Sequence, residues 1–459
     1  MTRLAAEAPI DWSSDDGFTV GHTDYSLVEF GHPRRGRAGS LAIYKSREQV
    51  ETFVDLVTAF PGSRIVELGI KAGGSTALLA QILHPARLVA VDIVRGPVRN
   101  FEAFLDTHEL RDRVRPYYGV DQADGQRLAH IVAEEFPDEA MDLVIDDASH
   151  LLEPTRTSFE VLFPRLRPDG LFVIEDWSWE HAIASKLVLA LSPESPTGRV
   201  PRLELLSAFK AIGVNPEMLG RLQSDQFLSD LVSDIIVRKA DGDAAIGDVT
   251  IRRFNVEIRR GPGMSDADCL AAPPTPGASP RALHVGRLHA QLAAPITSLG
   301  VRQLVVACEE PPGEQAWDEP ETTHIARDPL HCLALEVAGE LDRESFDLVI
   351  DGASPDAERA RELASVLLPR VRPGGTYMLR SWPRLMAPRY GNETDLPRRR
   401  MPPLLLEFIL AVAEWNGAIE EIRLGRDWLT VRRGMHDVPW EDFDLSRLYR
   451  DHFESLSRP

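Results

Sequence analysis

Acidic residues and one histidine gather at the ends of two apolar segments in the first half of the chain. Asp146 and Asp147 close the segment MDLVIDD, and His150 follows three residues later. Glu175 and Asp176 close the next such segment, LFVIED. If both segments are parallel strands, their carboxyl ends face one crevice, where ligands bind. Asp147, Glu175 and Asp176 should then converge, and without a cation their charges would raise one another's pKa.

A hard divalent cation such as Mg²⁺ accounts for this convergence, because carboxylate oxygens and water are its normal ligands. We therefore predict that Asp147, Glu175 and Asp176 bind the metal. His150, on the loop that follows, is placed to act as a general base. The alternative is that Asp147 only caps a helix and that His150 is an ordinary polar surface residue.

A second set of residues follows the first apolar strand, in the segment VELGIKAGGST. Gly69 and Gly73 predict a tight turn that lets the backbone approach a nucleotide-like ligand. The helix that opens at Ser75 presents free amide groups to such a ligand. Asp92 ends the next strand, 23 positions after Gly69, where a carboxylate can accept hydrogen bonds from both ribose hydroxyls.

These features suit NAD nearly as well as S-adenosylmethionine. The glycine spacing is G-x-x-x-G-G rather than G-x-G-x-x-G, which weakens the dinucleotide interpretation. Glu67 stands two residues before the first glycine, where it could meet a cationic amino-acid group. S-adenosylmethionine has such a group and a dinucleotide does not, so we predict S-adenosylmethionine. A plain tight turn with surface carboxylates remains the alternative.

Three further polar residues are predicted to contact the cofactor. Asp121 and Gln122 follow the third strand and could read the adenine edge, although a loop there could be merely polar. Asp146 ends the fourth strand and should face the same crevice.

The elements that must position these residues alternate along the chain. Strands are expected at 64–68, 88–92, 114–119, 142–146 and 171–175, with a helix at 75–83 and helical spacing over 41–60. This alternation predicts an α/β fold, a Rossmann-like doubly wound parallel sheet. Residues 1–38 are interpreted as an arm or lid, and residues 39–261 as the catalytic domain.

An internal repeat organises the second half. Residues 141–177 and 346–382 align without a gap at an offset of 205, with 17 of 37 positions identical, whereas chance gives about 2. Both halves also close on Arg-Arg-Gly. We predict a Pro/Gly/Ala-rich linker at 262–282, a second copy of the fold at 283–436 and a C-terminal tail at 437–459. Matching Leu304 to Ile65 makes this copy shorter by about one strand-plus-helix unit.

The copy lacks the residues assigned to chemistry. Asp147, His150, Glu175 and Asp176 are replaced by Gly352, Pro355, Arg380 and Ser381. Matching Leu304 to Ile65 puts Val306 and Cys308 where Glu67 and Gly69 stand. We therefore expect a degenerate domain that binds neither cofactor nor metal and packs on the first domain, as a partner subunit would. An independent domain on a flexible tether is the alternative.

The motifs Asp-Asp-Ala-Ser-His, Arg-Pro-Asp-Gly and Ile-Glu-Asp-Trp resemble those of the Mg²⁺-dependent sugar O-methyltransferases of macrolide biosynthesis, of the mycinamicin and macrocin type. They also resemble the cephalosporin hydroxylase family. The resemblance covers about residues 63–177. It implies a class I methyltransferase fold, a metal held by Asp147, Glu175 and Asp176, and His150 as the base. It does not explain the second copy or Lys71 in the glycine loop.

The leading hypothesis is thus transfer of a methyl group from S-adenosylmethionine to a hydroxyl of a small-molecule acceptor, a sugar or natural product. One alternative is an enzyme of a different reaction type on the same scaffold, because fold does not fix function. The other is a binding or scaffolding protein derived from a methyltransferase, which would have no affinity for the cofactor.

The composition of the chain disfavours some classes of binding partner. The 459 residues carry a net charge of −20, which disfavours nonspecific binding to nucleic acid and to anionic membranes. The N-terminus lacks the pattern of a signal peptide, and the most apolar stretch, 404–415, is short and holds Glu407. Three cysteines without metal-type spacing make a disulfide framework unexpected. We expect a cytoplasmic protein, with self-association left open.

Overall fold

The chain forms two compact units in the computed structural model: residues 1–177 with 189–228, and residues 178–188 with 229–459. The structure describes residues 10–28, 39–60, 62–137, 140–179, 227–261, 280–285, 303–308, 321–326, 346–352, 354, 356–386, 401–413 and 417–435. Residues 229–261, which we assigned to the catalytic domain, group with the second unit. The proposed tail and most of the proposed linker lie outside the described residues.

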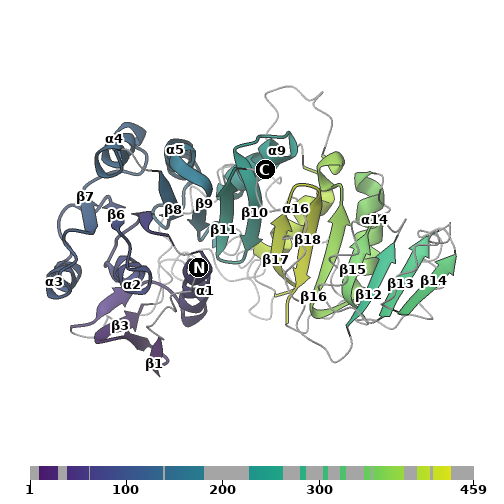
Figure 1. The fold of residues 1–459 in the computed structure, drawn as a ribbon, viewed down its shortest axis with the longest axis horizontal. Helices are drawn as coiled ribbons and strands as arrows, with labels where there is room; N and C mark the ends of the chain where they lie inside the picture. Colours follow the sequence, from purple (N-terminus) through teal and green to yellow (C-terminus); the bar gives the residue numbers. More distant parts are fainter. Residues whose placement is uncertain are drawn as a thin grey trace, which may run out of the picture. The chain divides into compact units, whose positions relative to one another are not determined.

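The first unit contains the predicted parallel sheet (Figure 1). Its strand order is β7-β6-β5-β8-β9, and every neighbouring pair is parallel. The strands are β5 (Arg64–Leu68), β6 (Arg87–Asp92), β7 (Val114–Tyr118), β8 (Met141–Asp146) and β9 (Leu166–Glu175). β5 and β8 are almost wholly buried, as strands covered on both faces must be.

Helices cover both faces of this sheet. The helices are α1 (Arg47–Ala59), α2 (Gly74–Leu83), α3 (Arg99–Thr107), α4 (Gly125–Glu135) and α5 (Leu152–Leu162), followed by the 3₁₀ turn η1 (Phe163–Arg165). α4 and α5 pack together on one face, and α1, α2 and α3 lie on the other (Figure 1). The predicted fold class is therefore confirmed for this unit.

Asp142 links three strands through hydrogen bonds at the amino-terminal end of the parallel sheet. Its carboxylate accepts hydrogen bonds from the amides of Ser63 (3.0 Å) and Arg64 (2.8 Å) and from Arg167 Nε (2.7 Å). Burial alone would raise the pKa of Asp142, but the guanidinium groups of Arg64 and Arg167 bring it below its usual value. The interaction ties β5, β8 and β9 into one register.

The N-terminal segment, which we interpreted as an arm or lid, contains strands that form a sheet of their own. It consists of β1 (Asp11–Ser14), β2 (Gly17–Val20), β3 (Thr23–Leu27) and β4 (Leu41–Ile43), in that order. The predicted helix over 41–60 starts only at Arg47, because Ser46 caps it in a capping box with Gln49. The backbone of Ala42 lies so close to Gly74 that any Cβ there would collide with the Ala42 carbonyl oxygen. β4 is thus held against the start of α2.

The second unit contains a mixed sheet in the order β14-β13-β12-β15-β16-β18-β17-β10-β11. Its strands are β10 (Ile246–Arg252), β11 (Asn255–Arg260), β12 (Arg281–Val285), β13 (Gln303–Cys308), β14 (Glu321–Ala326), β15 (Phe346–Asp351), β16 (Val371–Arg380), β17 (Ile419–Leu424) and β18 (Trp428–Arg433). The five strands from β14 to β16 are parallel to their neighbours, and the remaining pairings in the unit are antiparallel.

The alignment of Leu304 with Ile65 and the missing strand inferred from it were wrong, since the described residues of the second unit include five parallel strands, as those of the first unit do. Leu304 lies in β13, whereas β12 pairs with β15 as β5 pairs with β8. The residue that takes the register of Glu67 is therefore His284, because both stand opposite the residue just before the final aspartate of the neighbouring strand. The error arose because β12 is short and begins at Arg281, within the proposed linker.

The helices of the second unit are α9 (Leu228–Ala240), α14 (Ala357–Leu367) and α16 (Pro403–Ala413), with 3₁₀ turns η3 (Leu368–Arg370) and η4 (Trp382–Leu385). α16 corresponds to the apolar stretch identified in the sequence. Its buried Glu407 is bound by Arg361 Nη2 at 2.6 Å. None of the described helices is both long enough and apolar enough to cross a lipid bilayer.

Candidate active site

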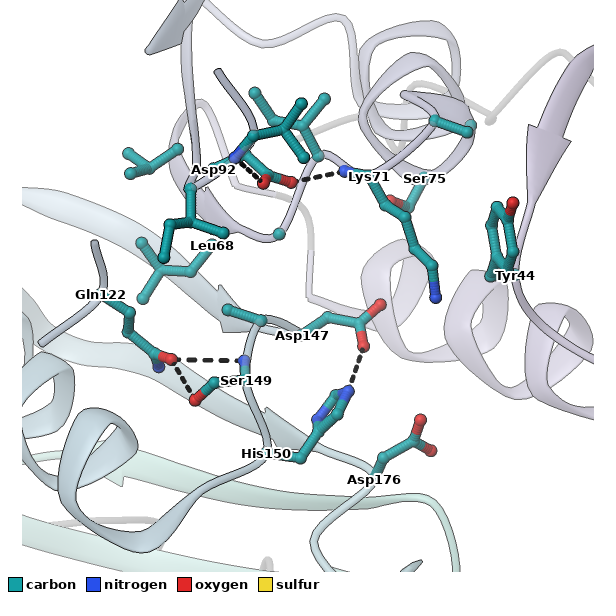
Figure 2. A pocket seen from close by; sticks show the side chains of 18 of the residues that line it. Tyr44, Leu68, Lys71, Ser75, Asp92, Gln122, Asp147, Ser149, His150 and Asp176 are labelled. Carbon is teal, nitrogen blue, oxygen red and sulfur yellow. Dashed lines mark hydrogen bonds and ion pairs between the residues drawn. The ribbon is translucent and has the colours of Figure 1, made fainter. Parts of the chain in front are cut away.

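A cavity of about 260 Å³ lies at the carboxyl ends of the parallel strands of the first unit. The loops after β5, β6, β7, β8 and β9 contribute to its wall, and so do residues just before α1 (Figure 2). The predicted site residues that line it are Gly69, Ser75, Asp92, Asp121, Gln122, Asp147, His150 and Asp176. Four others do not line it: Glu67, Gly73, Asp146 and Glu175.

The glycine loop brings two strand ends close together. Gly69 has φ 105°, and a Cβ there would collide with the carbonyl oxygen of Asp147. Gly73 has φ 82° at the N-cap of α2 and packs against Phe101, so it shapes the turn, and its place at the cofactor stays a prediction. Ser75, in the first turn of α2, faces the cavity. Amides of a helix's first turn lack intrahelical partners and are available to a ligand.

Asp92 is held in place by two backbone amides. Its Oδ2 accepts a hydrogen bond from the amide of Lys71 (2.6 Å), and its Oδ1 accepts one from the amide of Val94 (2.7 Å). Both bonds are visible in Figure 2. Each carboxylate oxygen retains acceptor capacity, so this fixed carboxylate is able to accept further hydrogen bonds, and its contact with ribose hydroxyls stays a prediction.

Gln122 links the cavity to the buried end of β8. Its Nε2 donates to Asp146 Oδ2 (2.6 Å), and its Oε1 accepts from Ser149 Oγ (2.7 Å). Ser158 Oγ also donates to Asp146 Oδ2, at 2.5 Å. Burial raises the pKa of Asp146 to about 6, against the lowering effect of the Ser158 hydroxyl. Asp146 thus orients Gln122 and the loop carrying Ser149, and its direct contact with the cofactor stays a prediction.

Glu67 is fully buried, and among the described residues neither of its carboxylate oxygens has a hydrogen-bond partner. Burial raises the pKa of Glu67 to about 7, although the nearby hydroxyls of Thr76 and Ser75 lower it somewhat. Buried polar groups are normally paired. An unpaired carboxylate beneath the glycine loop therefore calls for a ligand, a water molecule or a proton.

Asp147, His150 and Asp176 form the acidic cluster of the cavity. Each offers one ligand atom, and these atoms all lie within 4.8 Å of one another. His150 Nε2 is 3.7 Å from Asp147 Oδ1, and Asp176 Oδ1 accepts from Gln49 Nε2 at 3.1 Å. Figure 2 shows the three side chains directed toward one region. Two carboxylates and an imidazole suit a divalent cation.

The backbone at two of these residues is unusual. His150 has φ 53° and Asp176 has φ 51°, a left-handed conformation that residues other than glycine adopt uncommonly. Such conformations cost on the order of 1–3 kcal/mol each and cluster at functional sites, where surrounding structure enforces them. Here they turn the two side chains toward the cluster.

Sequence reasoning missed Lys45, which lies between β4 and the cap of α1. Its Nζ donates to Asp147 Oδ2 at 2.8 Å and forms a second, short ion pair with Glu175. Lys45 is only 4% exposed. Glu175, the third predicted metal ligand, is consequently bound to a lysine and does not belong to the three-residue cluster. Nothing in the local sequence distinguishes this lysine, because its position depends on the packing of β4 against α2.

The charges of the cluster depend on one another. Burial would lower the pKa of Lys45, but the charges of Asp147, Glu175 and Asp176 raise it well above its usual value. Burial would raise the pKa of Asp147, but Lys45 and His150 bring it below its usual value. For Glu175 burial dominates and raises the pKa despite the ion pair with Lys45. The ammonium group of Lys45 is therefore the counter-charge of a buried anionic site.

Comparison with known proteins assigns a class to this segment. Residues 66–177 match the family model described as a methyltransferase domain. Together with the strand order β7-β6-β5-β8-β9, this match identifies the Rossmann-like fold of class I methyltransferases. The match covers the glycine loop, Asp92 and the acidic cluster.

Two curated relatives show what the segment is similar to. It is 35% identical over 120 residues to demethylmacrocin O-methyltransferase of Streptomyces fradiae. It is 42% identical over 119 residues to mycinamicin VI 2''-O-methyltransferase of Micromonospora griseorubida. Each match covers 25% of this chain and 27% of the relative, so the chain spans about a quarter of their length. The predicted resemblance to macrolide sugar O-methyltransferases is confirmed for this segment.

Among solved structures, the chain is similar to the MycE methyltransferase of the mycinamycin biosynthetic pathway, which was crystallised with Mg and SAH. The identity is 23%, the TM-score is 0.30, and the match covers 48% of this chain and 52% of that one.

Proposed function

We propose that this protein is an S-adenosylmethionine-dependent, Mg²⁺-dependent O-methyltransferase that acts on a hydroxyl of a sugar or natural product. The observation that supports it best is that one cavity joins two kinds of site. Asp92 and the glycine loop line one part of it, and Asp147, His150 and Asp176 line another. A methyl donor and an acceptor hydroxyl must meet in such a space. Sugar methylation by the two curated relatives supports the acceptor class.

The residues present fit both groups. The unpaired, buried carboxylate of Glu67 is an anionic group near the glycine loop, as a cationic amino acid requires. Asp92 has its carboxylate fixed by two amides and open to ribose hydroxyls. For the metal, Asp147 and Asp176 provide hard oxygen ligands beside His150. When bound, the cation would lower the pKa of a coordinated hydroxyl.

In this proposal His150 accepts the proton of the acceptor hydroxyl, and Asp147 stabilises the imidazolium that results, since Oδ1 lies 3.7 Å from Nε2. The acceptor oxygen forms a bond to the methyl carbon while the carbon–sulfur bond breaks. The electron pair of the broken carbon–sulfur bond stays on sulfur, so the sulfonium becomes a neutral thioether. Positioning of the two reactants by the cavity supplies much of the rate.

Residues 283–436 are, in the same proposal, a degenerate copy that binds neither cofactor nor metal. The elements α14, η3 and β16 follow α5, η1 and β9 at a constant offset of 205 residues. Asp347 accepts from the amide of Arg281 (2.8 Å) and pairs with Arg372, as Asp142 does with Arg64 and Arg167. Structural contacts are thus retained where the cluster residues are replaced.

Two measurements test the proposal. Calorimetric titration with S-adenosylmethionine should give one site per chain, and turnover of glycosylated polyketide acceptors should stop in Asp147→Ala and on chelation of Mg²⁺. Release of S-adenosylhomocysteine in the presence of a chelator, or a chain that binds no S-adenosylmethionine, would reject it. Binding without methyl transfer to any acceptor would favour an enzyme of another reaction type.

A further inference from the structure

Lys45 is delivered to the acidic cluster by the N-terminal sheet. The Val28 amide donates to the Ile43 carbonyl oxygen (2.9 Å), which continues the pairing of β3 with β4. β4 is held against α2 by the close approach at Gly74. Two residues after β4, Lys45 precedes Ser46, the cap of α1. Fixed elements on both sides therefore determine where the ammonium group lies.

The surroundings of Lys45 are those of a cation site. Its Nζ contacts Asp147 Oδ2 and Glu175, lies 5.4 Å from the centre of the Phe53 ring, and feels the charge of Asp176. Lys71 is another positively charged side chain near this cluster, and the imidazole of His150 lies beside Asp147. The side chain of Lys45 is 3% exposed, so water contributes little to the solvation of its charge. Carboxylates and an aromatic face replace that water.

One of the two carboxylates that Lys45 binds, that of Asp147, is also a proposed ligand of the divalent cation. A carboxylate oxygen bound to an ammonium group is a weaker ligand, and two cations in one buried cluster repel each other. We propose that Lys45 is a resident counter-cation, which competes with the divalent cation for Asp147 and so sets the affinity of the site for metal. This inference rests on the metal site proposed above.

The competition has a second consequence, for the metal-free protein. Without metal, Lys45 compensates the buried carboxylates, since an unpaired buried charge is strongly destabilising. Removal of the ammonium group should therefore make folding depend on the metal. Lysine stabilises the empty site at the expense of metal affinity.

The test is titration of the full-length protein with Mn²⁺ alone, followed by electron paramagnetic resonance of free Mn²⁺, with Mg²⁺ as competitor. Lys45→Met and Lys45→Gln should bind Mn²⁺ roughly tenfold or more tightly than the unchanged protein, because a like charge has left a low-dielectric site. The glutamine variant covers the case in which Lys45→Met does not fold without metal.

Lys71→Met is the matched control. Lys71 lines the same cavity, but its Nζ lies over the Tyr44 ring at 4.0 Å. Loss of this charge should change the affinity for Mn²⁺ by less than about threefold, because the charge of Lys71 affects Asp147 less than the charge of Lys45 does. The second readout is thermal unfolding: Mn²⁺ should raise the melting temperature of both Lys45 variants by more than that of the unchanged protein.

Equal or weaker Mn²⁺ binding in the Lys45 variants would overturn the inference while leaving the metal site in place, provided that Asp176→Asn still abolishes binding. An equal gain in Lys71→Met would also overturn it, since net charge alone would then explain the effect. If no variant binds Mn²⁺, or if Asp176→Asn binds it normally, the proposed metal site fails and the inference fails with it.

Discussion

At Glu67, burial of the side chain opposes ionisation of its carboxyl group. A buried carboxylate without partners is costly when ionised, and the raised pKa of Glu67, about 7, expresses that cost. The same property suits it to a cationic ligand, because binding would replace the missing counter-charge. Stability of the ligand-free protein should therefore respond to this one group.

We predict that Glu67→Gln removes a pH dependence of stability. The folded-state pKa is raised from 4.5 to about 7, so the folded state holds the proton more tightly. The resulting stabilisation is present below pH 4.5 and is lost as the pH rises toward 7. From pH 5 to 8 the unchanged protein should lose up to about 3 kcal/mol relative to Glu67→Gln. Urea unfolding at several pH values measures this, and parallel pH profiles would contradict it.

Asp92 should carry part of the cofactor affinity. Charge-assisted hydrogen bonds are worth about 1.5–3 kcal/mol, so Asp92→Ala should weaken S-adenosylmethionine binding roughly ten- to a hundredfold. Calorimetry measures the change, and Asp55→Ala, which removes an exposed carboxylate on α1 outside the cavity wall, serves as the control. Unchanged affinity in Asp92→Ala would remove it from the cofactor site.

His150 should act on the rate rather than on binding. His150→Ala is expected to lower kcat by about 10²–10⁴ if it accepts the proton, with the affinity for S-adenosylmethionine unchanged. Since His150 also belongs to the three-residue cluster, Mn²⁺ affinity must be measured on the same variant. A loss of metal affinity that accounts for the loss of rate would make His150 a ligand instead of the base.

At the scale of elements, the sequence predicts strands well where burial on both faces produces continuous apolar runs. β5, β8 and β9 of the first unit were recognised for that reason. β12 was not recognised, because it is a strand of only five residues and follows a proline-rich stretch. Lys45 was missed because its role arises from β4 lying beside α2, a long-range contact that no local pattern encodes.

At the scale of elements, replacement of Gly69 should strongly disturb the contact between the loops that follow β5 and β8. Any Cβ there would meet the carbonyl oxygen of Asp147, and φ 105° disfavours other residues. Gly69→Ala should therefore displace the loop carrying Asp147, with a loss of about 1–3 kcal/mol from backbone strain and further loss from the collision. Thermal unfolding and Mn²⁺ titration both report this.

Gly96→Ala provides the matched control. Gly96 has φ 123°, but a Cβ there would meet nothing within 4 Å, so it isolates the strain from the collision. Equal effects in the two variants would mean that the approach of β5 to β8 does not depend on Gly69.

At the scale of the whole molecule, two hairpins of the second unit have matching cross-strand pairs. Hairpin β10–β11 and hairpin β17–β18 have the same register at an offset of 173, including the irregularity near the start of β10 and β17. In the proposed repeat the first hairpin ends one copy and the second ends the other. β10 pairs antiparallel with β17, and Thr250 stands opposite Arg423, its own equivalent at that offset. Such self-equivalent pairing is what a two-fold axis produces in a homodimer.

We predict that this pairing can be locked within one chain. Opposed residues in antiparallel strands have Cα atoms about 4.5–5.5 Å apart, which lies in the range that a disulfide spans. With the three native cysteines replaced by serine, Thr250→Cys with Arg423→Cys should therefore oxidise to an intramolecular disulfide and migrate as a monomer. Thr250→Cys with Leu424→Cys should not, because successive side chains of a strand point to opposite faces. Equal yields in the two variants, or a disulfide only between chains, would show that the second copy does not occupy a partner's place.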